Sequence, residues 1–377
     1  MIIDQYLRDL IRNEGSDLHL KVGRPPLMRI RGDLLPTKLS PLTKSAMDEI
    51  LLPMLSEGQK KKLVEERELD FSYLIEGIAR FRGAIFHQSG FLSAVFRLIP
   101  MKIQTLDDLG HPPVFKELIM AHQGLILITG PTGSGKSTTL AALVDYLNIN
   151  TKKHIITIED PLEFVHSDKQ CTINQREVGS DTSSFFTALK RALRADPDVI
   201  LVGEMRDPET IQTALTASET GHLVLSTLHT NYAKQSISRI IDAFPPEQHH
   251  HIRIRTAASL VATVAQRLVK RSDGTGRVAV IEIMINTPTI RKLISDERLD
   301  QIDKMIAESA HLYKMQTMNQ HLFQLVMDGV LTREHALNES HNPNDLRIML
   351  QTQEVAVKKE QEEKKKALVG SKLPWER

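Results

Sequence analysis

The chain has 377 residues, with 48 lysines and arginines against 47 aspartates and glutamates, so its formal net charge is +1. A balance this even excludes a global electrostatic field that would draw the chain to nucleic acid or to anionic lipid. The single cysteine, Cys171, excludes an internal disulfide framework and a zinc site built on paired CxxC motifs. We expect a cytoplasmic protein of two globular domains that binds no nucleic acid directly and meets a membrane only through partners.

The first 98 residues predict a small α+β domain. Apolar residues in the first eleven positions recur with helical spacing, and charged residues interrupt them, which argues against a signal peptide or membrane anchor. The alternating runs at 16–23 and 27–32 predict strands, and residues 80–98 repeat that pattern with Gly90 near a turn. We expect residues 1–98 to form the domain and residues 99–113 to form a linker.

From Gly124 onward, apolar runs rich in β-formers alternate with helical stretches. The runs are GLILITG, HIITIED, DVILVGEM, HLVLSTLHT and RVAVIEIMI. Runs that are apolar on both faces predict a largely parallel sheet covered by helices, that is, an α/β domain over 114–350. The chain becomes mainly helical after about residue 290. Residues 351–377 carry charge runs without an apolar stripe, and predict a solvated helix or a disordered tail.

The segment GPTGSGKS at 130–137 matches the GxxxxGK[ST] motif of a phosphate-binding loop. It follows the predicted strand LILIT and precedes a predicted helix, which is the context that the motif requires. Its glycines let backbone N–H groups surround phosphate oxygens, while Lys136 neutralises phosphate charge and Ser137 ligates Mg²⁺. We therefore predict that the chain binds ATP with Mg²⁺; the expected nucleotide-binding residues of this segment are Gly133, Ser134, Gly135, Lys136, Ser137 and Thr138.

Acidic side chains follow two of the predicted strands. DPDVILVGEM has the form of a Walker B strand, in which four apolar residues lead to an acid near the metal, here Glu204. The run ITIEDPLEFVH places Glu159, Asp160 and Glu163 after another strand, at the sheet edge where a parallel sheet has its active site. One of these carboxylates could orient or deprotonate the attacking water. For Asp160, which precedes Pro161, capping of the following turn is an equally good interpretation.

Two histidines, His222 and His229, bracket the strand LVLSTLHT. A spacing of seven residues puts them at opposite ends of the strand, so they do not form one zinc site. Contact of a histidine with the γ-phosphate and a purely structural role both fit this spacing.

These motifs, in this order, resemble the secretion ATPase superfamily, and most closely its type IV pilus retraction branch, the PilT and PilU motors. The resemblance rests on the Walker A segment, ITIEDPLEFVH, QREVGSDTSSFFTALKRALRADPDVILVGEMRDPET and TGHLVLSTLHT. It covers about residues 1–350, including SDLHLKVGRPPLMRIRG. It implies a RecA-like P-loop ATPase domain with a smaller N-terminal α+β PAS-like domain, and a homohexamer that binds ATP between adjacent protomers.

The resemblance also assigns roles to individual residues. It implies that Glu163 is the general base and that Glu204 organises Mg²⁺ and water, with Lys136 completing the catalytic set. It implies that His222 and His229 couple nucleotide state to neighbouring contacts. Two residues, Arg82 and Arg97, match N-domain arginines that reach the phosphates as the domains close; without the resemblance, each would be read as a solvated residue or a local ion pair.

The branch implies work on an inner-membrane platform protein at the base of a pilus, with a paralogous retraction ATPase as a further partner. Residues 289–296 depart from the principal motor, and MQTMNQ and NPNDLR are closer to the accessory paralogue, whereas GEMRDPETIQTALTASETGHLV is closer to the principal motor. Both roles stay open. A pilus-assembly or secretion ATPase, a DNA-transfer ATPase and a nucleotide-gated regulator with weak turnover are the remaining alternatives.

Overall fold

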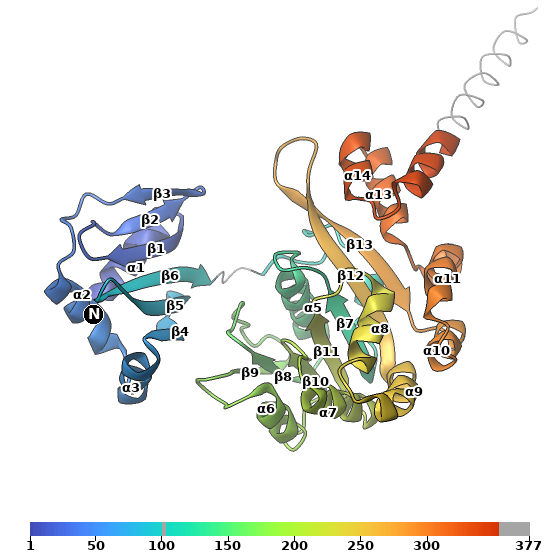
Figure 1. Cartoon of the computed structure of the whole chain (residues 1–377), viewed down its shortest axis with the longest axis horizontal. Helices are drawn as coiled ribbons and strands as arrows, with labels where there is room; N and C mark the ends of the chain where they lie inside the picture. The colour runs from blue at the N-terminus through green and yellow to red at the C-terminus, as the bar shows by residue number, and fades with distance from the viewer. Residues whose placement is uncertain (100–102, 354–377) are drawn as a thin grey trace, which may run out of the picture. The chain divides into compact units, whose positions relative to one another are not determined.

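The structure is a computed structural model that describes residues 1–99 and 103–353 (Figure 1). It divides into two compact units, each made of two segments. One unit combines Met1–Thr105 with Ala141–Glu204, and the other combines Leu106–Leu140 with the residues from Met205 onward. The expected domain limits at 98, 113 and 350 stay predictions. Most of the expected charged tail, residues 354–377, lies outside the described residues.

The N-terminal part of the first unit holds a six-stranded sheet of order β3-β2-β1-β6-β5-β4. Its strand pairs are antiparallel. The strands are β1 (Gly15–Lys21), β2 (Leu27–Ile30), β3 (Asp33–Pro36), β4 (Glu68–Ile75), β5 (Ala79–Gln88) and β6 (Phe91–Ile99), and the helices are α1 (Ile2–Arg12), α2 (Lys44–Leu51) and α3 (Glu57–Glu66). The predicted opening helix is confirmed.

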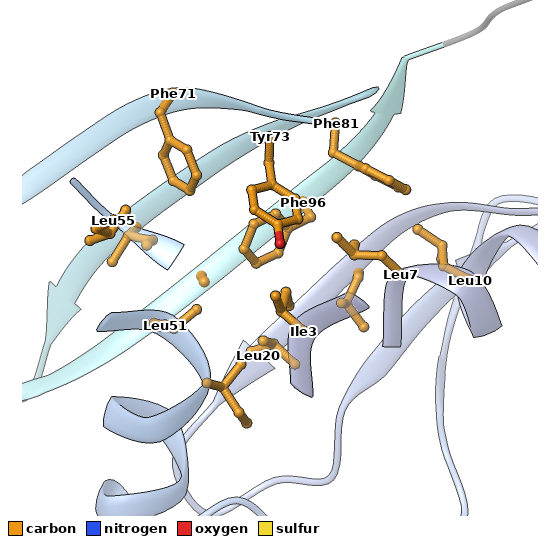
Figure 2. Close-up of a cluster of buried hydrophobic side chains, with 14 of the residues drawn as sticks. Ile3, Leu7, Leu10, Leu20, Leu51, Leu55, Phe71, Tyr73, Phe81 and Phe96 are labelled. Carbon is orange, nitrogen blue, oxygen red and sulfur yellow. The ribbon is translucent and has the colours of Figure 1, made fainter. Parts of the chain in front are cut away.

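The core of this sheet domain lies between the helices and one face of the sheet. In α1, Ile3, Leu7 and Leu10 are fully buried, which is the spacing of one helical face. Figure 2 shows these side chains directed toward Phe81 and Phe96 of the sheet. Burial of each large aliphatic side chain contributes roughly 1.5–3 kcal/mol. Because successive side chains of a strand point to opposite faces of the sheet, one set lies in this core and the other set lies on the opposite face.

The second sheet has seven strands in the order β13-β12-β7-β11-β10-β8-β9. β7 pairs in parallel with β11 and β12, and β8 pairs in parallel with β9 and β10, whereas β12 and β13 form an antiparallel hairpin. The strands are β7 (Gly124–Thr129), β8 (His154–Glu159), β9 (Thr172–Glu177), β10 (Val199–Val202), β11 (Leu223–Leu228), β12 (Leu260–Lys270) and β13 (Arg277–Ile285). The expected runs all form strands, whereas β9 and β12 lie in segments for which the sequence predicted none.

Helices connect and cover these strands. They are α4 (Val114–Leu118), α5 (Lys136–Asn150), α6 (Phe185–Ala192), α7 (Pro208–Glu219), α8 (Ala233–Ile241), α9 (His249–Ser259), α10 (Pro288–Ser295), α11 (Ile302–Glu308), α12 (Ala310–Tyr313), α13 (Met318–Met327) and α14 (Arg333–Glu339). The last two share a core with the β12–β13 hairpin, in which Leu322 packs with Ala265 and Val280. Among the residues that the structure describes, no helix combines the length and apolarity needed to cross a bilayer.

Candidate functional site

The predicted phosphate-binding loop joins β7 to α5. All six residues of β7 are buried, and α5 begins at Lys136 directly after the loop. Gly130, Gly133 and Gly135 have φ values of 147°, 79° and 88°. At Gly130 a Cβ would lie 2.2 Å from the backbone oxygen of Gln266, so this position has no room for any side chain. The loop is therefore a backbone structure in which glycine is required sterically as well as conformationally.

Lys136 folds back over the loop. Its residue exposure is 9%, and its Nζ donates hydrogen bonds to the backbone oxygens of Gly130 at 2.9 Å and of Pro131 at 3.1 Å. An ammonium at this place adds positive charge to the positive N-terminal end of α5. The arrangement suits an anion bound against the loop.

The hydroxyl groups of the loop fit such an anion. Ser134 is 2% exposed, and its Oγ finds no hydrogen-bond partner among the described residues. Ser137 and Thr138 lie half-buried in the first turn of α5. A buried hydroxyl without a partner is costly unless a ligand completes its bonding. The loop thus provides backbone N–H groups, an ammonium and an orphan hydroxyl, which together fit a polyphosphate, and Ser137 supplies an oxygen of the kind that Mg²⁺ prefers.

Gln266, from β12, is a site residue that sequence reasoning missed. Its Nε2 donates to the Ser134 backbone oxygen at 2.8 Å, and its Oε1 accepts from Thr139 Oγ1 at 3.0 Å. No local pattern marks this glutamine, because its partners lie more than 120 positions earlier. The apolar run of Leu260–Lys270 is a local signal for the strand β12, but not for a role of this glutamine.

Further predicted site residues lie directly before or after strands of the second sheet. In one unit, Leu228 pairs with Thr129 in parallel register, so His229 directly follows the strand beside the start of the loop. His222 precedes the same strand, and its Nδ1 lies 3.0 Å from the Ala217 backbone oxygen. Seven residues of extended chain span about 23 Å. The structure therefore places His222 away from the phosphate-binding loop of its own chain, and the contact expected of both histidines is reachable here only for His229.

In the other unit, β8 and β10 end side by side, because Val202 pairs with Ile158. Glu159 and Glu204 therefore follow at the same edge. The Glu159 carboxylate accepts from Thr157 Oγ1 at 2.8 Å and from the Glu163 backbone N–H at 3.4 Å. Burial raises the pKa of Glu159, and the charge of Glu163 raises it further. The turn after β8 is thus held by Glu159, while the Glu163 side chain is exposed and open to a substrate.

The two predicted arginines lie directly opposite each other on the N-terminal sheet. Arg82 in β5 pairs with Arg97 in β6, and Arg97 pairs in turn with Asp17 in β1. Arg97 Nε donates to Asp17 Oδ1 at 2.8 Å, and Arg29 Nε lies 3.6 Å from Asp17 Oδ2. Like charges directly opposite on one face destabilise a sheet. Arg97 and Arg29 therefore share the buried Asp17 carboxylate, while Arg82 lies opposite Arg97. This face has the charge to attract an anion, and the local ion pair considered for Arg97 is present.

A β-strand, a glycine loop closed by a lysine, and the N-terminus of a helix, set in a mainly parallel sheet, define a P-loop nucleotide-binding protein. Acidic residues at the ends of β8 and β10 are the group types that P-loop enzymes use toward metal and water.

The family follows from comparison with known proteins. Residues 1–355 match the model of the family described as Type II/IV secretion system protein, and the chain belongs to that family. It is 47% identical over 345 residues to the Type IV pilus retractation ATPase PilT of Pseudomonas aeruginosa, covering 92% of this chain and 100% of that protein. It is 41% identical over 350 residues to the Type IV pilus ATPase PilU of the same organism, covering 93% and 91%.

A solved structure agrees with this placement. The crystal structure of the pilus retraction motor PilT with bound ADP superimposes with a TM-score of 0.85 at 43% identity, covering 91% of this chain and 98% of that one. The predicted fold class, a RecA-like α/β ATPase domain with a smaller N-terminal α+β PAS-like domain, is confirmed. The predicted resemblance to the retraction branch is confirmed as well.

Proposed function

We propose that this chain is an ATPase that powers the retraction of a type IV pilus. The observation that carries the proposal is the loop at residues 130–137, with buried Lys136 and the unpartnered Ser134 hydroxyl, in a chain 47% identical over nearly its whole length to a pilus retraction ATPase. The loop supports nucleotide binding, and the sequence identity supports pilus retraction as the process that ATP hydrolysis drives.

The chain's residues divide the work on ATP. The Nζ of Lys136 exchanges its backbone acceptors for phosphate oxygens, and the loop N–H groups and the Ser134 hydroxyl donate to the same anion. Bound Mg²⁺, held by Ser137 and by Glu204 directly or through water, would polarise the phosphate and neutralise its developing charge. Among residues 1–99 and 103–353 there is no group of three His, Cys, Asp or Glu side chains that could hold a metal. Mg²⁺ in nucleotide sites usually takes only one or two protein ligands.

Glu163 is the proposed general base. Its side chain is exposed, and its backbone N–H donates to the half-buried Glu159 carboxylate, which leaves the Glu163 carboxylate free to accept a proton from water. His229, at the end of β11 beside the loop, is proposed to contact the γ-phosphate. Glu159 then serves to hold the turn rather than to react.

Motor action needs more than one subunit. We propose a homohexamer in which Arg82 and Arg97 reach the phosphates of a nucleotide held between adjacent protomers. The like charges on the N-terminal sheet support this, since an approaching phosphate relieves their repulsion. Arginines that arrive only on closure tie hydrolysis to domain motion. The ring would act at the cytoplasmic base of the pilus on an inner-membrane platform protein.

The test is steady-state phosphate release by the full chain with MgATP, with oligomer size recorded by light scattering. Lys136→Ala and Glu204→Ala should abolish turnover. Lys152→Ala is a matched control, because this lysine is exposed just beyond the far end of α5, about 22 Å of helix from Lys136. Turnover by a hexamer that survives only in the control supports the motor. Turnover equal in all four proteins, or a monomer in the presence of ATP, would overturn it.

A second candidate is an accessory retraction ATPase that works beside a paralogue. The 41% identity to PilU over 93% of the chain favours keeping it. The same assay separates the two: weak turnover alone that rises on adding a paralogous motor supports the accessory role, whereas full turnover alone supports the principal one.

A further inference from the structure

Four buried residues from three segments form one chain of hydrogen bonds that ends at the phosphate-binding loop. His111 Nε2 lies 2.9 Å from Thr139 Oγ1, Thr139 Oγ1 lies 3.0 Å from Gln266 Oε1, and Gln266 Nε2 lies 2.8 Å from the Ser134 backbone oxygen. Exposures are 8% for His111, 1% for Thr139, and 2% each for Gln266 and Ser134. Water therefore offers these groups little alternative bonding.

The donor and the acceptor of each hydrogen bond in this series follow from which groups carry a hydrogen. A backbone oxygen only accepts, so the Gln266 amide nitrogen faces Ser134 and its amide oxygen faces Thr139. That oxygen also only accepts, so Thr139 uses its one hydroxyl proton on it. The Thr139 oxygen must then accept from His111, which makes Nε2 the protonated nitrogen. Burial lowers the pKa of His111 to about 4, with a further contribution from His321, so the ring is neutral at pH 7.

His111 is held in place from its own side. Its ring stacks on Phe115 with centroids 4.8 Å apart and planes 25° apart, and its backbone N–H donates to the Leu106 oxygen at 3.0 Å. The His111 imidazole is therefore fixed by contacts within the segment 106–118, which begins within the expected linker and continues into α4. Its Nδ1 has no hydrogen-bond partner among the described residues. Only the Nε2 side therefore carries a directional contact.

The last hydrogen bond of this series, from Gln266 to the Ser134 carbonyl, sets the direction of one backbone N–H group of the loop. In a trans peptide the C=O of one residue and the N–H of the next point in opposite directions. Gln266 holds the Ser134 carbonyl toward β12, so the Gly135 N–H points the other way, away from β12. Rotation of the Ser134–Gly135 peptide plane would change which N–H groups of the loop point toward a bound phosphate.

We propose that His111 is a positioning residue which, through Thr139 and Gln266, sets the Ser134–Gly135 peptide for phosphate binding and links nucleotide occupancy to the segment 106–118. This inference rests on the proposed nucleotide function of the loop. It assigns a role to a residue outside every motif, and it predicts that the start of the ATPase domain senses what the loop holds.

The test compares three variants of the full chain for ADP affinity, ATP turnover and melting temperature without nucleotide. His111→Phe keeps the ring stack but loses the donor, and should weaken ADP binding about 2- to 10-fold, as loss of one hydrogen bond does. His111→Gln carries an amide N–H near the Nε2 position and should recover most of the affinity. Thr139→Val should match His111→Phe, and the double variant should be no weaker than either single one.

A second readout needs no variant. Nitrogen NMR shifts of His111 should report the Nε2–H tautomer, and amide exchange over 106–118 should slow on adding ADP to the wild type but not to Lys136→Ala.

Variants that lower the melting temperature yet bind ADP as the wild type does would reduce His111 to a packing residue. The Nδ1–H tautomer, or equal affinity of the Phe and Gln variants, would also overturn the inference. If the wild type binds ADP and these results appear, only the positioning role fails; if the wild type binds no nucleotide, the proposed function fails with it.

Discussion

The steric argument about the loop can be tested at Gly130. Replacement by alanine forces a residue with a Cβ into a φ of 147°, a conformation that costs about 1–3 kcal/mol for residues other than glycine. The Cβ would also lie 2.2 Å from the Gln266 backbone oxygen and 2.6 Å from Ser134 Oγ. Gln266 pairs with Ile281 of β13, and the preceding residue, Ala265, pairs with Thr129 of β7, so β12 is paired on both sides and resists moving. Overpacking of this kind adds about 1–3 kcal/mol.

We therefore expect Gly130→Ala to lower stability by about 2–6 kcal/mol as the sum of these two costs. We also expect ADP binding to weaken at least about tenfold, because the loop must shift to relieve the contact. Differential scanning calorimetry without nucleotide and titration with a fluorescent ADP analogue measure the two effects.

The matched control is Gly274→Ala, in the turn between β12 and β13. Gly274 has a φ of 71°, but a Cβ there meets nothing within 4 Å. Its cost should be the left-handed conformation alone, about 1–2 kcal/mol, with ADP affinity unchanged. Equal destabilisation by the two variants, or normal ADP binding by Gly130→Ala, would refute the claim that β12 restricts the loop.

Three further substitutions test the acidic groups. Glu163→Gln should slow single-turnover hydrolysis about 10²- to 10⁴-fold while ADP affinity changes less than about twofold, and an unchanged rate would place the base elsewhere. Asp17→Asn should lower turnover by up to about 100-fold at constant ATP affinity, because Arg97 loses its anchor; Asp33→Asn, an exposed carboxylate, is the control. Although burial raises it, the pKa of Asp17 is held below 3.8 by hydrogen bonds from Ser16 and Arg97 and by arginine charge. The contribution of ionised Asp17 to the free energy of unfolding is therefore present above pH 3.8 and lost as the pH falls through the lowered pKa. Plots of the free energy of unfolding against pH for the wild type and Asp17→Asn should converge in acid. Glu282 shows the opposite sign: burial raises its pKa from 4.5 to about 7, so its contribution to stability is present below pH 4.5 and lost as the pH rises through 7. Glu282→Gln should gain about 3 kcal/mol on the wild type between pH 4.5 and 8 in paired denaturation curves, and a difference independent of pH would contradict the assignment.

Local patterns along the chain were enough to predict the phosphate-binding loop and most strands. The loop depends on short-range chemistry, since the glycines, Lys136 and Ser137 act within eight consecutive positions. The strands β7, β8, β10 and β11 are buried on both faces, and such strands read as unbroken apolar runs. The helical stripe of α1 has the same origin, because one face of eleven residues packs on one core.

Pairing between distant segments decided the rest. The turn near Gly90 places Arg82 opposite Arg97 within one hairpin, but Arg97 also has a partner 80 positions away in Asp17, and nothing in the neighbourhood of either residue of that ion pair indicates it. The same holds for Gln266 and His111, whose hydrogen bonds reach the loop from a strand and a connecting segment that carry no motif.

The sequence by itself determined which groups hold the phosphate, because those groups are neighbours in the chain and their geometry is that of one turn and one helix start. Only the tertiary structure decided what holds those groups in place, and which of two equivalent histidines lies beside the loop. Hydrogen bonds between segments more than a hundred residues apart follow from sheet order and register, and a single sequence contains no local signal for either.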